Sequence, residues 1–507
     1  MFNANQMHEK TDADQLIARV QLLEQTNGLL EQENRWLKQQ LFGRSSEKRE
    51  NPPPANQPWL FNEAEAVGGA DEPTKSITIP SHSRKARGRK PIAADLPRVD
   101  IVYDLADDDK ICPKDGATLT CIGDERSEQL DYIPAKVQVL RHIRLKYACP
   151  CCSAHMAVAE KPPQLLPRSN AAPSLLAHIA CAKFVDGLPL NRQEKQFHRL
   201  GLDLPRATTA NWMIKLGDAV IPIVNLLNDY LLDGPLIHCD ETTLQVLRSK
   251  KAPSSDHFMW VRAGGTADRK VLLFDSAPSR SAEIARRLLA DFKGTLLTDG
   301  YQAYDVVAST QGLVHAACLA HVRRYFKDVT KAQPEASRNA NIALDYIGRV
   351  YGVERDLREQ KIPPTAAERY EARQRRSRPI MVEFRNWLDE IAPKLLPESK
   401  FGKAVHYALG QWSKLQVYLD DPAVPIDNNR CENAIRPFVV GRRAWLFCDT
   451  QAGADASARL YSLVESAKAN GVEPHAYLTH LFTHLPSAST VEHFEALLPW
   501  NVKSSTH

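Results

Sequence analysis

The stretch Leu236-Ile-His-Cys-Asp240-Glu-Thr-Thr-Leu-Gln-Val-Leu247 predicts a β-strand, because apolar and β-branched residues dominate it and no turn residue interrupts it. It also places an acid, Asp240, in the interior of that strand. A buried aspartate is costly unless it is paired or binds a metal ion. Cys239 beside it should point to the opposite face, which makes it a core residue. The stretch therefore predicts a strand that carries a functional site.

The elements that follow this strand have a recognisable order. They are strands over 257–262 and 270–274, a helix over 281–292, a strand over 294–299 that ends in Asp-Gly, and a strand over 313–318 before a basic helix around His321. This is the order of a ribonuclease H-like fold, in which the first and fourth strands are neighbours. Asp240 and Asp299 would then converge on a site for a hard divalent cation, Mg²⁺ or Mn²⁺. A lone aspartate at a strand end is usually a cap, but two in this topology favour the metal site.

A third acid lies far downstream, in Ile426-Asp-Asn-Asn-Arg-Cys-Glu432-Asn-Ala-Ile-Arg436-Pro437. The Asp-Asn-Asn run offers helix N-caps, so Glu432 is predicted in the first turns of a helix. Glu432 and Arg436 are four residues apart, and a surface ion pair is the alternative to a catalytic role. Cations crowd this segment and favour a surface that faces phosphate: Arg430, Arg436, Arg442 and Arg443.

The interval between the second and third acids is more than twice that between the first and second. It is too long for the remaining strand and helix of such a fold. Apolar residues recur at helical spacing through 330–422, so we predict an all-helical insertion there. The basic run from Arg373 to Arg378 inside it predicts either a DNA contact or a solvated loop.

A helix-turn-helix pattern precedes the acids. Residues 172–200 are predicted to be helical, Leu200-Gly-Leu202 is a turn, and a second helix begins near Pro205. Trp212 would anchor that second helix in the core. Its polar side chains would enter a major groove: Arg206, Thr208, Thr209 and Asn211. Two antiparallel core helices would give a similar pattern, and that alternative stays open.

The N-terminal region predicts self-association and a DNA contact. Leucines recur every seven residues, at Leu16, Leu23, Leu30 and Leu37. This heptad predicts a coiled coil between chains, with an amphipathic helix of a single domain as the alternative. A proline-rich linker then leads to a basic strip whose Arg87-Gly-Arg89 core is similar to an AT-hook. Such a strip inserts arginines into a narrow minor groove, and the alternative is a solvated basic run.

Half of the ten cysteines fall between Cys112 and Cys152. Cys149 and Cys152 form a C-x-x-C knuckle, and a first knuckle has Asp115 where a second cysteine is expected. The candidate zinc ligands are Cys112, Asp115, Cys121, Cys149 and Cys152. The segment between the knuckles, from Val137 to Tyr147, alternates apolar and basic residues and predicts a strand. A decayed ribbon that folds without metal is the alternative. For Cys318-x-x-His321 we favour a structural hydrogen bond over a second zinc site.

Composition excludes other classes of protein. The chain has 507 residues, 43% of them hydrophobic and 25% charged, so it is not wholly disordered. Its N-terminus has no signal-peptide pattern and no stretch is long and apolar enough to span a membrane. Ten cysteines are too few for a disulfide scaffold, so we expect a reducing cytoplasm. The net charge of +4 averages opposing segments and does not by itself indicate a partner.

Taken together, these motifs resemble the insertion sequence 66 family of bacterial transposases. The residues that carry the resemblance occur in the same order over roughly 10–485: Leu41-Phe-Gly-Arg-Ser-Ser-Glu-Lys48, the Cys-Pro-x-Asp-Gly knuckle, His238-x-Asp240-Glu-Thr, Thr298-Asp299-Gly-Tyr and Asn429-x-x-Glu432-Asn-Ala-Ile-Arg-Pro437. The resemblance implies a DDE enzyme whose three acids are Asp240, Asp299 and Glu432. It also implies small accessory proteins encoded by the same element.

We therefore predict a multidomain α/β protein with a ribonuclease H-like core. Its parts are a coiled coil (10–45), a linker with the basic strip (46–98), a zinc-ribbon-like domain (99–160), a helix-turn-helix-like domain (165–230), the core (231–329 and 423–485) around an all-helical insertion (330–422), and a tail (486–507). We place it in the bacterial cytoplasm, with the nucleoid.

The predicted activity is that of a transposase. It would bind the element's terminal repeats, cut DNA strands and join the 3′ ends to target DNA by two-metal phosphoryl transfer. His238, Glu241 and Arg436 are auxiliary candidates for positioning phosphate or water. The predicted partners are double-stranded DNA and a second copy of the chain. No membrane association is predicted. Two alternatives stay open: a non-catalytic DNA-binding regulator, and a ribonuclease H-like nuclease or resolvase that only hydrolyses.

Overall fold

The computed structural model describes Arg19 and residues 137–148, 156–160, 162–249, 256–332 and 337–502. Three predicted features lie outside these residues: the zipper (all of it except Arg19), the strip with Arg87 and Arg89, and the candidate zinc ligands. Of the strand predicted over 137–147, only its end is a strand: β1 (Lys146–Ala148) pairs antiparallel with β2 (Met156–Val158). No helix among the described residues is long and apolar enough to cross a membrane.

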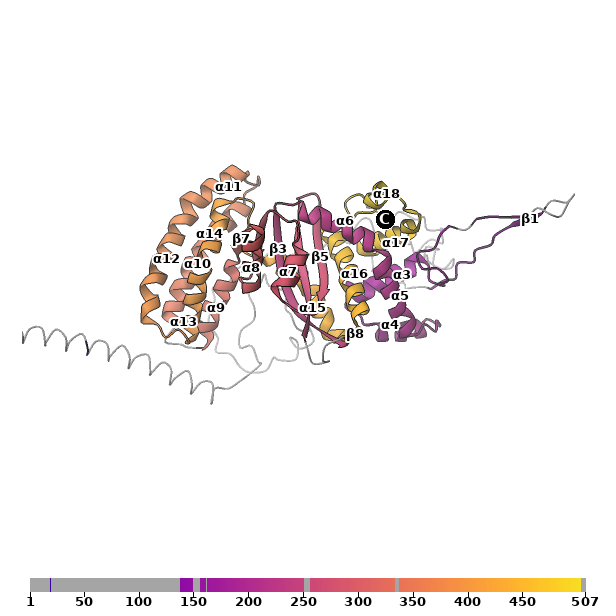
Figure 1. Ribbon diagram of the computed structural model, residues 1–507, viewed down its shortest axis with the longest axis horizontal. Coiled ribbons are helices and arrows are strands. Elements are labelled where there is room, and N and C mark those ends of the chain that lie inside the picture. The colour runs from indigo at the N-terminus through magenta and orange to yellow at the C-terminus, as the bar shows by residue number, and fades with distance from the viewer. Residues whose placement is uncertain are drawn as a thin grey trace, which may run out of the picture. The chain divides into compact units, whose positions relative to one another are not determined.

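A mixed sheet holds the predicted strands in the order β5-β4-β3-β6-β7 (Figure 1). Its strands are β3 (Leu236–Arg248), β4 (Asp256–Gly265), β5 (Lys270–Ala277), β6 (Thr295–Thr298) and β7 (Val314–Ala317). Strand β4 runs antiparallel to both β3 and β5, whereas β6 is parallel to both β3 and β7. The predicted pairing of the first and fourth strands is confirmed. Leu236 pairs with Thr295, and the same offset carried along β3 aligns Asp240 with Asp299.

The β5 edge of the sheet is covered by a helix from the C-terminal part of the chain. On α16 (Gln451–Ala469), Ser462 and Ser466 are one helical turn apart. The Ser466 hydroxyl bonds both the N–H and the C=O of Leu272, and the N–H of Phe274 donates to the Ser462 hydroxyl at 2.8 Å. Serine hydroxyls thus satisfy backbone groups that an exposed edge strand would leave open to another chain.

Helices from both ends of the described chain share one core. They are α3 (Pro173–Phe184), α4 (Leu190–Arg199), α5 (Arg206–Ala219), α6 (Ile221–Leu232), α16, α17 (Pro474–His484) and α18 (Val491–Glu495). The close approach of α5 to α16 depends on Gly217, where an added Cβ would lie 2.6 Å from the Cα of Ala456. Arg459 of α16 also donates to the carbonyl of Gly217 at 3.2 Å. The α3–α5 helices therefore fold against residues more than 200 positions downstream.

The helix predicted over 172–200 is instead two helices, α3 and α4. Gly187 separates them with a φ of +67°, a left-handed conformation that glycine adopts without strain. Pro189 follows, at the N-cap of α4. The apolar pattern did not show this break because the turn between the two helices is itself largely apolar.

A separate group of helices follows β7 and encloses its own core, at the left of Figure 1. Its elements are α9 (Leu319–Ala332), α10 (Ser337–Arg358), α11 (Ala366–Ala372), the π-helical turn η2 (Arg373–Ser377), α12 (Arg378–Ile391), the short η3 (Ala392–Lys394), α13 (Lys400–Gly410) and α14 (Trp412–Asp420). Phe326, Phe384 and Trp412 pack at its centre. The described part of 330–422 is thus helical, as predicted.

The basic run at 373–378 is not a loop but the turn η2 and the start of α12, and its end residues are engaged within the protein. Arg373 is 1% exposed, pairs through two bonds with Glu354, and donates to the carbonyls of Tyr418, Asp421 and Val424. Arg378 pairs with Asp420. These cations close the C-terminal end of α14 and fix the segment that leads toward Glu432.

Candidate active site

Asp240 lies in β3 at a largely buried position, as the sequence predicted. Its Oδ1 accepts a 2.9 Å hydrogen bond from the N–H of Glu241. Burial, together with the negative charges of Glu241, Asp299 and Glu432, raises the pKa of Asp240 to about 8. Glu241 is next to Asp240 in the chain, whereas Asp299 and Glu432 act on it from 59 and 192 positions downstream. The fold therefore gathers carboxylates at one place.

Asp299 is held by the turn that follows β6. Its Oδ1 accepts a 2.9 Å bond from the N–H of Tyr301, and its carbonyl accepts a hydrogen bond from the hydroxyl of Tyr407 in α13. Gly300 next to it has a φ of +88°, so the Asp-Gly turn needs glycine at this point. The turn and Tyr407 together fix the backbone that presents the second acid.

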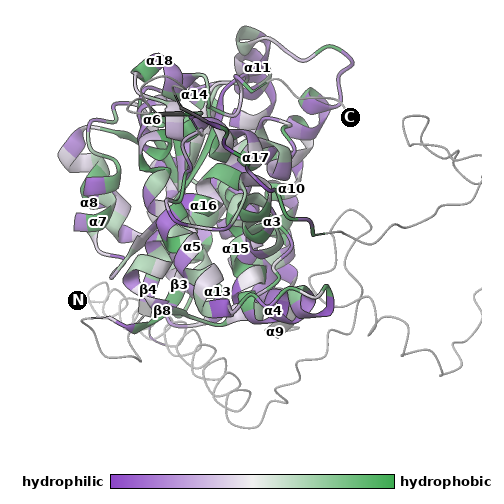
Figure 2. Cartoon of the chain, turned by 90° about the vertical axis from the view of Figure 1, so that its right-hand side faces the viewer, coloured by the Kyte–Doolittle hydropathy of each residue, from purple (hydrophilic) through white to green (hydrophobic). Residues whose placement is uncertain are grey.

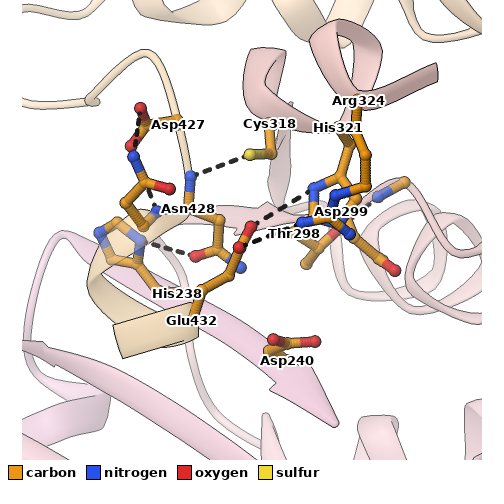
Figure 3. Close-up of polar contacts among 12 residues, drawn as sticks. His238, Asp240, Thr298, Asp299, Cys318, His321, Arg324, Asp427, Asn428 and Glu432 are labelled. Atoms are coloured by element: carbon orange, nitrogen blue, oxygen red, sulfur yellow. Dashed lines mark hydrogen bonds and ion pairs between the residues drawn. The ribbon is translucent and has the colours of Figure 1, made fainter. Parts of the chain in front are cut away.

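Glu432 lies in the first turn of α15 (Asn429–Trp445), again as predicted. Its carboxylate points toward α9, where Oε2 accepts from Arg324 at 3.3 Å and Oε1 lies 3.6 Å from Nδ1 of His321 (Figure 3). Cys318, His321 and Glu432 each offer a candidate ligand atom, and these atoms lie within 4.8 Å of one another. Within the described residues the three acids do not form such a group, because Glu432 is turned toward α9.

A buried network fixes the start of α15 against β3. Asn428, the N-cap residue, donates through Nδ2 to the carbonyl of Cys239 at 2.8 Å, and its own N–H donates to Sγ of Cys318. Its Oδ1 bonds Nδ1 of His238 at 2.8 Å. Figure 3 shows Asn428 between these partners, beside Glu432. The hydrogen bond that we favoured for Cys318 is therefore present, with Asn428 as its donor.

The auxiliary role predicted for His238 is wrong in its direct form. The residue is 2% exposed and its ring is engaged by Asn428, so it does not reach phosphate or solvent water. Burial lowers the pKa of His238 to about 4, which keeps the ring neutral. His238 acts instead on the position of Asn428 and, through the helix start, on Glu432.

Glu241 is also engaged within the protein. Its carboxylate accepts from Arg280 at 2.5 Å and from the hydroxyl of Tyr304 at 2.6 Å. Burial raises its pKa, while these two partners lower it. Each oxygen of Glu241 therefore already accepts one hydrogen bond within the protein, and the role predicted for it in positioning phosphate or water stays a prediction. Arg436 is half-buried on α15, one turn after Glu432.

Sequence reasoning missed three residues that position the acids: Arg324, Tyr407 and Asn428. Arg324 belongs to the basic helix predicted around His321, but the sequence does not indicate Glu432 as its partner. Asn428 lies in the quoted Glu432 motif, where it was assigned only to capping. Tyr407 had no signal, because nothing in its surroundings distinguishes it from a core tyrosine of α13.

The helix-turn-helix prediction survives in part. Helices α4 and α5 are joined by the Gly201 turn, where φ is +79°, and Trp212 is buried as expected. Arg206 and Asn211 are exposed and Thr208 is half-buried. Thr209 is 1% exposed and its hydroxyl donates to the carbonyl of Arg206, so its predicted groove contact is wrong. Thr209 falls on the face of α5 that packs into the core.

Comparison with protein families gives one consistent result. The profile described as "Transposase IS66 family" matches residues 168–456, which is more than half of the chain and includes all three acids. The chain belongs to the IS66 family of transposases. Three further profiles of this family match in order: "Transposase C of IS166 homeodomain" over 29–101, "zinc-finger binding domain of transposase IS66" over 109–153, and "IS66 C-terminal element" over 462–500.

Curated relatives of this IS66-family chain come from Sinorhizobium fredii. The uncharacterized protein y4jD is 33% identical over 84% of this chain and 86% of its own length. The uncharacterized protein y4qI is 32% identical over 83% of this chain and 78% of its own length. A third, the uncharacterized protein y4hP, is 28% identical over 85% of this chain. The similarity thus extends over nearly all of the chain.

Proposed function

We propose that this chain is a DDE transposase that cuts DNA at the ends of its element and joins the 3′ ends to target DNA. The observation that carries the proposal is the β3–β6 register, which aligns Asp240 with Asp299, and a third acid on α15, Glu432, acts on the same site. Burial and the neighbouring carboxylates together raise the pKa of Asp240 to about 8. Burying these carboxylates close together lowers the free energy of unfolding, because their negative charges repel one another. Such an arrangement is typical of a functional site rather than of a structural one. Membership in the IS66 family supports the same assignment.

The three acids are suited by their chemistry to Mg²⁺ or Mn²⁺. Hard divalent cations prefer carboxylate oxygens. A bound cation would also offset the repulsion between Asp240 and the acids that raise its pKa. Oε1 of Glu432 is buried and accepts no hydrogen bond, which leaves it available as a ligand. Asp240, Asp299 and Glu432 would hold the ions. Bound ions of this kind activate the attacking hydroxyl and stabilise the leaving oxygen in an in-line transfer.

The chain's own residues would prepare this site. Asp240 is largely protonated at neutral pH without a cation, so it must release a proton before it can act as a ligand. Asn428 and His238 fix the start of α15, which sets where Glu432 emerges. Arg324 and His321 hold the Glu432 carboxylate away from the aspartates. A rotation of this side chain toward Asp240 would complete the set of ligands.

We also infer the domain assignments that the comparisons leave open. The sheet order β5-β4-β3-β6-β7 with acids on β3 and after β6 supports a ribonuclease H-like core over 231–329 and 423–485. The helices with a separate core support an insertion at 330–422. We keep the coiled coil, the linker, the zinc-ribbon-like domain with structural Zn²⁺, and the C-terminal tail within the ranges given above.

Helices α4 and α5 are our proposed DNA-reading unit. Figure 2 shows α4 as largely hydrophilic, and its exposed residues include Arg192, Lys195 and Arg199. Arg206 and Asn211 lie exposed on α5, which follows the turn as a recognition helix does. Cations on the first helix would contact phosphates, while Asn211 would reach base edges.

The test uses the full chain, Mg²⁺ and a duplex that carries the element's terminal repeat. Glu432→Gln and Asp240→Asn should each reduce strand cleavage to background while binding of the duplex persists. Glu398→Gln is the matched control, since Glu398 is exposed and pairs with an exposed lysine, Lys403, at 2.9 Å. Cleavage by the Glu432→Gln protein at the wild-type rate would refute the assignment. Precut ends then separate a transposase from a simple nuclease, because only a transposase yields joined products.

A further inference from the structure

Two large apolar side chains are exposed where α15 ends. Leu446 is 63% exposed and Phe447 is 43% exposed. Leu446 has φ +66° and ψ −52°, a conformation that residues with a side chain rarely adopt. Strained backbone of this kind persists only where the surroundings enforce it, and it gathers at functional sites. At this strained turn both apolar side chains are exposed to solvent rather than buried.

The turn that carries these residues is fixed on both sides. The N–H of Leu446 donates to the carbonyl of Arg442 at 2.6 Å, and the N–H of Phe447 donates to the carbonyl of Trp445 at 2.9 Å. Strand β8 (Cys448–Thr450) begins at once and pairs with the far end of β3. Trp445 packs edge-on against Phe438 with ring centroids 5.6 Å apart. Leu446 and Phe447, which we call the apolar tip, therefore project from a rigid base.

The surroundings of the apolar tip are basic. Arg443 is exposed on the last turn of α15, and the side chain of Arg248, at the end of β3, is 77% exposed and pairs with Asp449 of β8 at 3.2 Å. Arg442 donates to the hydroxyls of Thr242 and Thr243 on the strand that carries Asp240. Three arginines against one acid, Asp449, leave this region net positive. Exposed apolar side chains beside arginines suit duplex DNA, which has anionic phosphates outside and stacked apolar bases inside. A protein partner would be expected to face a less cationic rim.

The apolar tip also lies near the proposed DNA-reading helices. A Cβ placed on Gly187, in the turn before α4, would lie 3.7 Å from the Cα of Gly441 in α15. In Figure 1, α4 and β8 lie at the same, lower end of the described chain. A duplex bound by α4 and α5 would therefore extend toward the same end of α15.

We propose that Leu446 and Phe447 enter the bound duplex as a wedge and unstack one base step of the element end. This inference rests on the proposed function, since it assigns the substrate's contact on the helix that carries Glu432. Leu446 follows Glu432 by fourteen positions along α15 and its C-cap, which is about 21 Å at ~1.5 Å per residue. At ~3.4 Å per base pair, the distorted step should lie about six base pairs from the cut phosphate.

The experiment places 2-aminopurine at successive positions of a terminal-repeat duplex and measures its fluorescence with the full chain in EDTA, so that no cleavage occurs. Wild type should raise the fluorescence several-fold at a single step about six base pairs from the cut. Phe447→Ala and Leu446→Gly should abolish that rise, and glycine also accepts the positive φ without strain. Ile362→Ala is the control, because Ile362 is 81% exposed in the helical region far along the chain. A mismatch at the distorted step should restore cleavage by the Phe447→Ala protein in Mg²⁺.

The outcomes separate this inference from the proposed function. Cleavage by wild type without a local rise in fluorescence, or a rise that both variants retain, would overturn the wedge and leave the transposase assignment standing. A change in the self-association of the Phe447→Ala protein with unaltered DNA signals would show a protein contact and would also overturn it. Loss of the signal in both variants, with rescue by the mismatch, supports the wedge. Failure of the wild type to bind or cut the duplex would refute the proposed function itself.

Discussion

Replacing Asp240 by asparagine should stabilise the metal-free protein while it abolishes cleavage. The pKa of Asp240 is about 8 in the folded chain, against 3.8 for an unperturbed aspartate. Because the folded state binds the proton more tightly, the free energy of unfolding falls as the pH rises from about 4 to about 8, and is constant above that. At pH 7 the difference of about three units corresponds to ~4 kcal/mol at 1.36 kcal/mol per unit. Residual solvent access and coupling to the neighbouring acids reduce this to roughly 2 kcal/mol.

The assay is urea denaturation of wild type and the Asp240→Asn protein in EDTA at pH 5, 7 and 8.5. The variant should gain little at pH 5 and most at pH 8.5, because an amide has no proton to release. Mg²⁺ should stabilise the wild type and not the variant, since a ligand that binds only the folded state raises its stability. A variant that is no more stable than wild type at pH 8.5, or equally stabilised by Mg²⁺, would contradict the reasoning. Asp389→Asn, at an exposed carboxylate, controls for the loss of one negative charge.

Three further outcomes are expected. Arg373→Ala should lower the free energy of unfolding by about 3–5 kcal/mol, because it leaves Glu354 and three carbonyls without their buried partner; calorimetry that finds no loss would contradict this. Asn211→Ala should weaken binding of the terminal repeat without changing stability, whereas Thr209→Ala should do the reverse; a filter-binding titration beside a melting curve distinguishes them. Chelation of zinc should unfold the region of the five candidate ligands and leave the remaining transition in place, as followed by limited proteolysis.

The sheet was predictable because its signals are local. Alternation, strand length and the Asp-Gly turn identified β3 to β7, and the fold class then placed Asp240 beside Asp299. The position of Glu432 on a helix was predictable from its capping residues. Each of these inferences needed only a short window of sequence and one rule of topology.

The failures arose where side chains a long way apart in sequence meet. Arg373 looked like a surface cation because nothing near it in the sequence reveals Glu354 or the three carbonyls. Thr209 looks exposed because its neighbours on α5 are polar, whereas the folded chain buries its side chain to 1% exposure. His238 was given a chemical role because histidine next to an acid suggests one, but its ring is bonded to Asn428. Tertiary partners of this kind leave no local pattern.

The packing of α3 to α5 against α16 has a consequence for the timing of synthesis. The proposed DNA-reading helices leave the ribosome long before α16 and Ala456, the residue on which Gly217 closes. Until the last fifth of the chain is made, these helices lack the surface that completes their core. A nascent or prematurely terminated polypeptide would thus have no folded DNA-reading unit and could not compete with intact protein for the element's ends. The protein would therefore become able to bind DNA only after the C-terminal helices have been translated.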